Sequence, residues 1–252
     1  MTNLNDKKVG ITGNALKLIA MITMLVDHCA YGLYYNYGIA NNNLNWEFYR
    51  FLRGVGRMAF PIYIFLLVEG FFHTRNVKKY AFRLLILAII SEIPFDWALF
   101  ESPFNWHKSN VVFTLLIGLI LIWTLDESKK GQLFGIKNPV LIKLVVILIY
   151  AAGCGISYVA CTDYTVAGVA AIVLMYHFHG EDLKHRLIAF GLTVAVLAIG
   201  CGTIEAAAAL MLIPIAFYNG QRGSSSKIIR YGFNYFYPVH LLIIGIVRAI
   251  LL

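Results

Sequence analysis

Residues 16–32, LKLIAMITMLVDHCAYG, form an apolar segment that is interrupted by an adjacent acid and base, Asp27 and His28. As a helix, about 20 such residues cross the roughly 30 Å hydrocarbon core of a bilayer. A cleaved signal peptide has instead a short, uninterrupted apolar core followed by small residues. We therefore interpret the segment as a transmembrane helix that carries an ionisable pair.

Apolar segments of this kind recur along the whole chain. Of its 252 residues, 60% are hydrophobic and only 13% are charged, whereas a soluble domain carries about 25% charged residues. The apolar residues are continuous, which favours helices. The sequence predicts an all-α, polytopic transmembrane helical bundle of about nine helices (eight to ten) in a single domain, 1–252. The predicted spans are 14–34, 57–74, 79–99, 110–126, 140–160, 164–178, 185–201, 203–218 and 232–251.

Lysine and arginine predict the orientation, because short cytoplasmic loops are enriched in both. With the N-terminus inside, the outer side receives only Arg50, Arg53, Arg57, Lys108 and Arg248. We expect a protein of the bacterial cytoplasmic (inner) membrane, with a cytoplasmic N-terminus and an external C-terminus. Basic loops that face anionic lipid headgroups explain the net charge of +8, so membrane lipids are expected partners and nucleic acid is not.

Residues 35–56 form the longest segment between predicted spans, and an asparagine cluster inside it indicates a turn. The part from 46 to 56 has aromatic residues at helical spacing, with arginines on neighbouring turns. This pattern is typical of a helix that rests in the headgroup region. A lid or a docking surface for an acceptor molecule is the alternative.

Several polar residues lie inside the predicted spans, where a charge costs roughly 3 kcal/mol and therefore usually faces a partner or a cavity. His28 lies about 18 Å along its helix from Leu16, and Asp27 points about 100° away from it around the helix axis. The candidates within the membrane are Asp27, His28, Arg57, Glu69, Glu92, Asp96, Asn110, Tyr237 and His240.

Several of these candidates also have an ordinary structural interpretation. Asp96 and Asn110 suit helix ends, Arg57 suits the outer headgroups, and His240 suits a core position bonded to a backbone carbonyl. The four cysteines lack the paired spacing of metal sites, so no metal is expected. Cys161 and Cys201 fall near the same predicted face, where a disulfide is compatible with their positions.

A histidine with a nearby carboxylate is suited to two different functions. It can act as the general base in group transfer, because the acceptor must lose a proton. It can also relay protons in a proton-coupled transporter or flippase of a small polar or lipid-linked substrate. A structural membrane subunit is a third interpretation. The residue pattern alone leaves the three open.

Three segments resemble the TraX family of membrane proteins. They are LKLIAMITMLVDH (16–28), GRMAFPIYIFLLVEGFFHTRNVKKYAFRLLILAIISEIPFD (56–96) and RYGFNYFYPVHLLII (230–244). The resemblance covers the first third of the chain and the last helix, while 120–225 matches only in general hydrophobicity. It implies a membrane-bound acyltransferase, related to the acyltransferase-3 proteins, that takes acetyl from cytoplasmic acetyl-CoA. It also implies that His28 is the essential histidine.

From this resemblance we expect a set of residue roles. His28 deprotonates the acceptor or carries the acetyl group, and Asp27 or Glu92 orients its imidazole. Arg57 or Asn110 stabilises the oxyanion. Residues expected to contact the substrate are Arg57, Glu69, Asn110, Tyr237 and His240, and those expected to hold the phosphates of acetyl-CoA are Lys17, Arg75, Lys78 and Lys79. The acceptor is a peptide, a glycan or a lipid-linked substrate.

Overall fold

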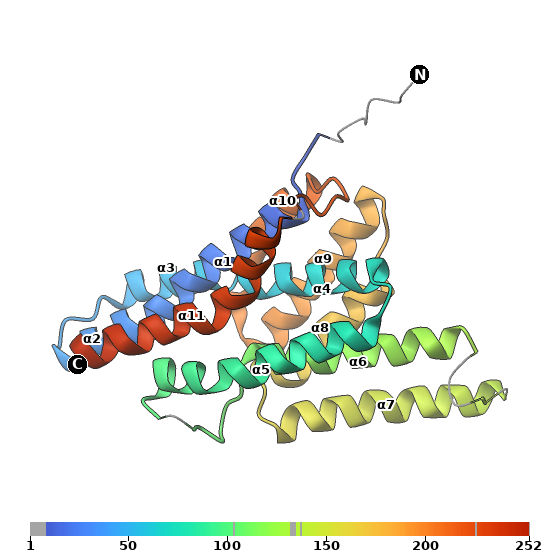
Figure 1. Cartoon of the computed structure of the whole chain (residues 1–252), viewed down its shortest axis with the longest axis horizontal. Coiled ribbons are helices and arrows are strands. Elements are labelled where there is room, and N and C mark those ends of the chain that lie inside the picture. The colour runs from blue at the N-terminus through green and yellow to red at the C-terminus, as the bar shows by residue number, and fades with distance from the viewer. Residues whose placement is uncertain (1–8, 103, 132–134, 137, 225, 252) are drawn as a thin grey trace.

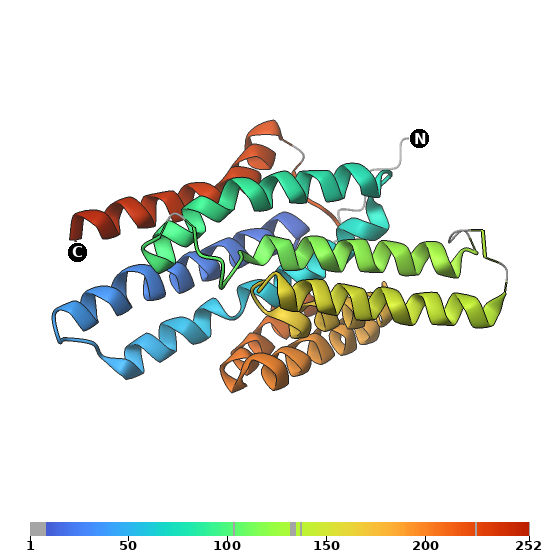
Figure 2. The ribbon, with the colours of Figure 1, turned by 90° about the horizontal axis from the view of Figure 1, so that it is seen from below.

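The computed structural model describes residues 9–102, 104–131, 135–136, 138–224 and 226–251. Within these ranges the chain forms helices and connecting turns, without a strand. The long helices run side by side, as Figure 1 and the turned view in Figure 2 show. In chain order the helices are α1 (Gly13–Cys29), the π-helix η1 (Ala30–Tyr35), α2 (Asn36–Ala40), α3 (Trp46–Gly56), α4 (Ala59–His73), α5 (Val77–Phe100), α6 (Val111–Lys129), α7 (Pro139–Val159), α8 (Thr165–His177), α9 (Leu183–Cys201), the 3₁₀ helix η2 (Thr203–Met211), α10 (Leu212–Ala216) and α11 (Lys227–Leu251).

Six helical stretches of the described chain are long and apolar enough to cross a membrane. They are 13–40, 46–73, 111–129, 139–159, 183–201 and 227–251. An all-α membrane bundle is therefore confirmed, whereas the predicted count of about nine spans is not.

The three other predicted spans fall short for different reasons. Helix α5 is long enough but carries Arg83, Glu92 and Asp96 within one span length. Helix α8 has only 13 residues, which rise about 20 Å and so cover only part of the hydrocarbon thickness. The 203–216 segment is a 3₁₀ helix followed by the short α10.

The segment between the first two predicted spans is mostly helical. The first helical stretch continues through η1 and α2 to Ala40, and α3 forms at 46–56 as predicted for an interfacial helix. The Asn45 side chain caps α3 by accepting a hydrogen bond from the Phe48 backbone N–H. Trp46, Phe48 and Phe51 are exposed. This outward aromatic face fits the headgroup region, where aromatic side chains gather.

Helices α3 and α4 follow one another with only Arg57 and Met58 between them. At the end of α3, a Cβ atom added to Gly56 would lie 2.2 Å from the Asp27 side chain. Real Cβ atoms do not approach this closely, so only glycine lets α3 pass so near to α1. The Gly56 contact therefore places Arg57 directly beside Asp27.

The buried apolar side chains form two clusters. The larger includes Phe65 on α4, Ile172 on α8 and Phe190 on α9. The smaller packs α1 against α5 and α11 through residues such as Met24, Phe95 and Leu241. His28 and His240 lie on the same two helices, α1 and α11, so this smaller cluster holds the two histidine-bearing helices together.

Candidate functional site

His28 and His240 form a buried pair between α1 and α11. Nδ1 of His28 lies 2.7 Å from Nε2 of His240. The two rings are inclined by only 7°, with centres 5.0 Å apart, as a hydrogen bond in the ring planes requires. His28 is 9% exposed and His240 is 4% exposed. The last helix thus supplies the partner of the His28 imidazole.

A backbone carbonyl fixes the proton positions in this pair. His240 Nδ1 lies 2.7 Å from the Phe236 carbonyl, which only accepts, so Nδ1 carries the proton. In the neutral ring Nε2 of His240 is then an acceptor, and it accepts from Nδ1–H of His28. The remaining nitrogen of neutral His28, Nε2, therefore holds a free lone pair. A nitrogen in this state can take a proton or attack a carbonyl carbon.

A π-helix begins two residues after His28, at Ala30–Tyr35. The Asn36 side chain donates to the carbonyls of Tyr31 and Gly32, at 3.0 and 3.1 Å. These bonds stabilise a backbone geometry that is rare in proteins and that frequently accompanies functional sites. The first helix therefore departs from regular α geometry next to the histidine.

Asp27 turns away from the imidazole and pairs with arginines of the α3–α4 region. Its carboxylate accepts from Arg57 at 2.7 and 2.8 Å and pairs with Arg53 at 2.8 Å. Side chains at consecutive helical positions point about 100° apart, which explains the separate partners of Asp27 and His28. The expected contact between Asp27 and the imidazole is thus replaced by the His240 contact.

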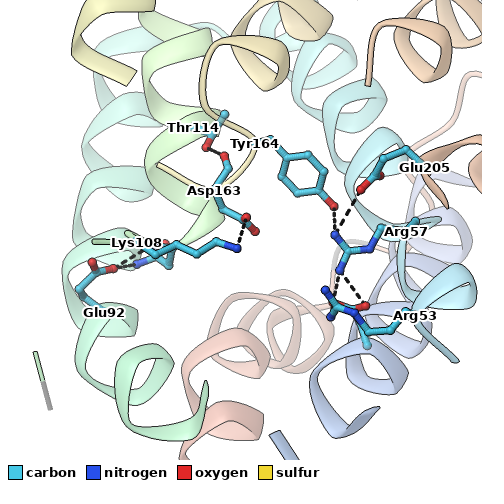
Figure 3. Close-up of polar contacts among 10 residues, drawn as sticks. Arg53, Arg57, Glu92, Lys108, Thr114, Asp163, Tyr164 and Glu205 are labelled. Carbon is cyan, nitrogen blue, oxygen red and sulfur yellow. Dashed lines mark hydrogen bonds and ion pairs between the residues drawn. The ribbon is translucent and has the colours of Figure 1, made fainter. Parts of the chain in front are cut away.

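Arg57 connects Asp27 to two residues from the second half of the chain (Figure 3). It donates to the Tyr164 hydroxyl at 3.2 Å and to Glu205 at 3.2 Å. Glu205 is 2% exposed. Glu205 and Tyr164 were not among the predicted site residues, although a lone acid in the apolar run 203–218 was a usable signal.

Glu92 and Asn110 are hydrogen-bonded to each other at the start of α6, apart from the histidine pair. Glu92 accepts from the Asn110 backbone N–H at 3.0 Å and from its side-chain amide at 2.5 Å. The same amide donates to the Ala88 carbonyl, and its oxygen caps α6 at Val112. Glu92 therefore positions Asn110, in place of the expected contact with the imidazole.

The structural interpretation as a residue that satisfies a helix end is confirmed for Asn110, which caps α6, whereas Asp96 bonds to a loop instead. Asp96 accepts from the backbone N–H of Asn105 at 2.7 Å, in the turn after α5. Because the Asn110 amide is fully used by Glu92 and Ala88, it has no free donor for an oxyanion.

A first cavity, of about 630 Å³, has Arg57 in its wall. It lies where the loops before α6 and α8 meet the junction of α9 and η2. Its wall includes Arg57, Lys108, Asp163, Tyr164 and Glu205, several of which Figure 3 shows pointing toward one another across this region. Lys108 pairs with Asp163 at 3.2 Å. This cavity is therefore polar and carries charges of both signs.

Cys161 and Cys201 both line this first cavity and are both free thiols in the structure. The disulfide considered from their positions in the sequence is thus not formed.

The second cavity, also of about 630 Å³, is a groove between α1 and the start of α11. Its wall is mostly apolar and reaches Met21 on α1 and Phe236 on α11. Phe236 supplies the carbonyl that holds His240, and its ring stacks on that of His240 at 4.6 Å. The groove therefore borders the histidine pair through Phe236.

Two further predicted site residues, Tyr237 and Glu69, lie in different places. Tyr237 is buried with its ring 6.1 Å from His28 and 5.7 Å from His240, so it packs against the pair. Glu69 lies elsewhere, bonded to His179 at 2.7 Å and to the Tyr218 hydroxyl at 3.1 Å. Glu69 thus connects α4 to two loops away from His28.

The basic residues predicted to hold phosphates also separate. Arg75, Lys78 and Lys79 are exposed around the α4–α5 turn and line neither of the two cavities. Lys17 differs, because its ammonium group lies 5.2 Å from the ring of Phe233, which lines the groove. Of the four, only Lys17 lies beside a cavity that leads toward the histidines.

Comparison with known proteins connects this geometry to a family. A protein of Dichelobacter nodosus, described as "Probable fimbrial assembly protein FimC, serogroup H1", is 29% identical over 255 residues, which cover 94% of this chain and 95% of that protein. No solved structure matches the chain. A family model described as "TraX protein" matches residues 12–248, and the chain therefore belongs to the TraX family.

Proposed function

We propose that this protein is a membrane-bound acyltransferase that moves an acetyl group from acetyl-CoA to an amine or hydroxyl of an acceptor. The observation that carries the proposal is the hydrogen-bond chain from the Phe236 carbonyl through His240 to His28. It leaves Nε2 of His28 unprotonated on a side chain that is only 9% exposed. A base with a fixed tautomer is what proton removal from an acceptor requires.

In direct transfer, Nε2 of His28 takes the proton of the acceptor N–H or O–H while the acceptor atom attacks the thioester carbonyl. The carbon–sulfur bond then breaks, and the CoA thiolate receives the proton from His28. The products are the acetylated acceptor and free CoA thiol, so atoms and charge balance. The same nitrogen serves as nucleophile in a route through an acetyl-imidazole.

Arg57 is the residue we assign to the oxyanion, because the Asn110 amide is already bonded to Glu92 and Ala88. Arg57 lines the first cavity, and its Nε is buried without a partner. A preorganised donor near a developing negative charge is a major source of catalysis in acyl transfer. Asp27 holds this guanidinium in place, and Tyr237 packs the imidazole pair.

We place the protein in the bacterial cytoplasmic membrane with a cytoplasmic N-terminus. In that orientation α5, α8 and the η2–α10 segment complete nine passes with the six long stretches, and the C-terminus lies outside. The groove then faces the acetyl-CoA pool, and the first cavity faces the acceptor. The printed name of the Dichelobacter nodosus relative refers to fimbrial assembly, which favours a protein acceptor over a glycan or lipid-linked one.

The alternative of a proton-coupled transporter or flippase is less well supported by the same contacts. A proton relay through His28 and His240 would end at the Phe236 carbonyl, which does not exchange protons at neutral pH. The chain of contacts is therefore better suited to holding one tautomer than to passing protons on.

The test is the release of CoA thiol from acetyl-CoA by purified protein, with peptide, sugar and lipid-linked acceptors supplied in turn. We expect His28→Ala to lower the rate by about 10²- to 10⁴-fold, the usual contribution of a general base. The control is His185→Ala, which removes an exposed histidine bonded to Asp182 in the turn before α9. Equal turnover by the wild type and His28→Ala would refute the proposal. Vesicle uptake driven by pH without thioester consumption would favour the transporter.

A further inference from the structure

The groove between α1 and α11 has a polar mouth and an apolar interior. The mouth is formed by Thr12, Asn14 and Ser224, at the first turn of α1 and the loop that precedes α11. The interior is lined by Ala15, Leu18 and Met21 on α1 and by Ile229, Gly232, Phe233 and Phe236 on α11. This polarity gradient fits an elongated ligand with a polar head and a less polar arm.

The mouth is held in place by hydrogen bonds between α1 and the loop. The backbone N–H groups of Gly13 and Asn14 donate to the carbonyls of Gln221 and Arg222, at 2.8 and 2.9 Å. The Asn14 side chain donates to the Ser224 carbonyl at 2.7 Å. The groove is therefore bounded by a fixed loop that brings Arg222 to the polar end.

Positive charge gathers at this polar end. Lys17 lies over the ring of Phe233, Arg222 lies in the bonded loop, and Lys227 begins α11. Cations at the mouth of a groove attract phosphate groups, both through direct contacts and through their summed field.

One residue of the groove wall, Phe236, contacts the histidine pair. Phe236 lines the groove, stacks on the His240 ring and accepts its Nδ1 proton. Met21, on the opposite wall, precedes His28 by two helical turns, or about 10 Å. The far end of a flexible arm that enters at the mouth therefore lies beside the Phe236 ring, next to His240.

We infer that this groove binds the acyl donor, with the pantetheine arm of the CoA thioester in the interior and the phosphates at the mouth. The inference rests on the proposed function and adds the donor site to it. The volume of about 630 Å³ lies within the usual range of small-ligand pockets, about 300–1,000 Å³. It accommodates the arm, while the nucleotide stays at the mouth.

Gly232 allows the interior to be filled without disturbing the fold. A Cβ atom added there meets nothing within 4 Å, and the same holds for Gly155 on α7, which is outside the groove. We expect Gly232→Leu to raise the KM for acetyl-CoA and the Kd for coenzyme A by at least about tenfold, since it occupies the space of the arm. Gly155→Leu is the matched control and should leave both constants unchanged.

A second pair of variants tests the mouth separately from the interior. Arg222→Gln should raise the KM for acetyl-CoA but not for acetyl-pantetheine, which lacks phosphate and nucleotide. Gly232→Leu should raise the KM for both donors. Arg75→Gln is the control for charge, because Arg75 is exposed and lines neither of the two cavities.

The outcomes separate this inference from the proposed function. If Gly232→Leu transfers acetyl with an unchanged KM and binds coenzyme A like the wild type, the groove is not the donor site, although the protein is an acyltransferase. If coenzyme A binding depends on Gly232 but no acceptor is acetylated, the donor site stands and the transfer function fails. If the wild type binds no coenzyme A, or if only lipid acyl chains compete for the groove, the inference is refuted.

Discussion

Nδ1 of His28 lies 2.7 Å from Nε2 of His240, so the proton on one ring determines the proton on the other. The Phe236 carbonyl starts this chain, because it accepts only. In our proposal His240 is consequently a positioning residue, which holds the catalytic base in one tautomer and one orientation.

His240→Ala is expected to lower kcat by about 10²-fold with little change in KM, because the base loses its fixed tautomer while the donor groove stays open. His240→Gln should restore part of the rate, since its amide oxygen can still accept from Nδ1 of His28. The measurement is the kcat and KM of CoA release as a function of pH. A wild-type pH profile in His240→Ala would contradict the positioning role.

Asp27 is expected to contribute to stability through its two arginine partners. Its side chain is 11% exposed and that of Arg57 is 13% exposed. Removing one member of a buried ion pair usually costs about 3–5 kcal/mol, because the other charge loses its compensation. Asp27→Asn should therefore lower the unfolding temperature in detergent much more than His28→Ala does. Similar unfolding temperatures for the two variants would show that Asp27 is not a structural anchor.

At the scale of elements, the approach of α3 to α1 decides where the charged side chains meet. Gly56 is the closest point, and the turn at Arg57 and Met58 follows it directly. The opposite end of the α4 helix is tied by Glu69 to His179 and Tyr218. Burial and the Glu69 carboxylate raise the pKa of Tyr218, so its hydroxyl remains a donor at physiological pH.

Gly56→Ala tests the close approach of the two helices. Its Cβ would overlap the Asp27 side chain, so we expect a loss of about 1–3 kcal/mol of stability, as for other overpacked sites, and a loss of activity. Gly54→Ala, in the same helix, is the control, since the nearest atom to its Cβ would be the Ala207 Cβ at 3.8 Å. Thermal unfolding and CoA release together provide the measurement. If Gly56→Ala and Gly54→Ala were equally stable and active, α3 could move away from α1 without a loss of stability.

At the scale of the whole molecule, a charged cavity and an apolar groove are both connected to the histidine pair through neighbouring residues. The charged cavity has Arg57 in its wall, which pairs with Asp27 beside His28. The groove has Phe236, whose ring stacks on His240. Helix α7 lies apart from this centre and packs against α6 and α8. Only 11% of its most apolar window is buried, so most of its surface is available to lipid.

Orientation can be tested with a membrane-impermeant thiol reagent in intact cells. In a Cys161→Ser, Cys201→Ser background, Trp106→Cys should react, because Trp106 lies in the exposed loop beside Lys108 on the side we assign to the exterior. Lys130→Cys, beyond the other end of α6, should react only after the cells are opened. The reverse pattern would invert the proposed topology and exchange the donor and acceptor sides.

Most of the long apolar helices were determined by the sequence alone. A hydrocarbon core requires long apolar helices, so composition and period identify most of them, including the first and the last. The position of Asp27 and His28 inside an apolar run follows from the same rule. The prediction of membrane spans was less successful for α5, which carries several charges, and for α8 and 203–216, which are short. Whether such a helix crosses the membrane depends on the helices packed around it.

The partners of these residues were decided only by the tertiary structure. His28 bonds to a residue 212 positions away, and Arg57 bonds to one 148 positions away. Sequence proximity suggested Asp27 as the orienting group of His28, but the helical turn of about 100° directs the two side chains to different helices. Polar groups in the membrane take whichever partner the packing brings within hydrogen-bond distance, and local sequence does not contain that information.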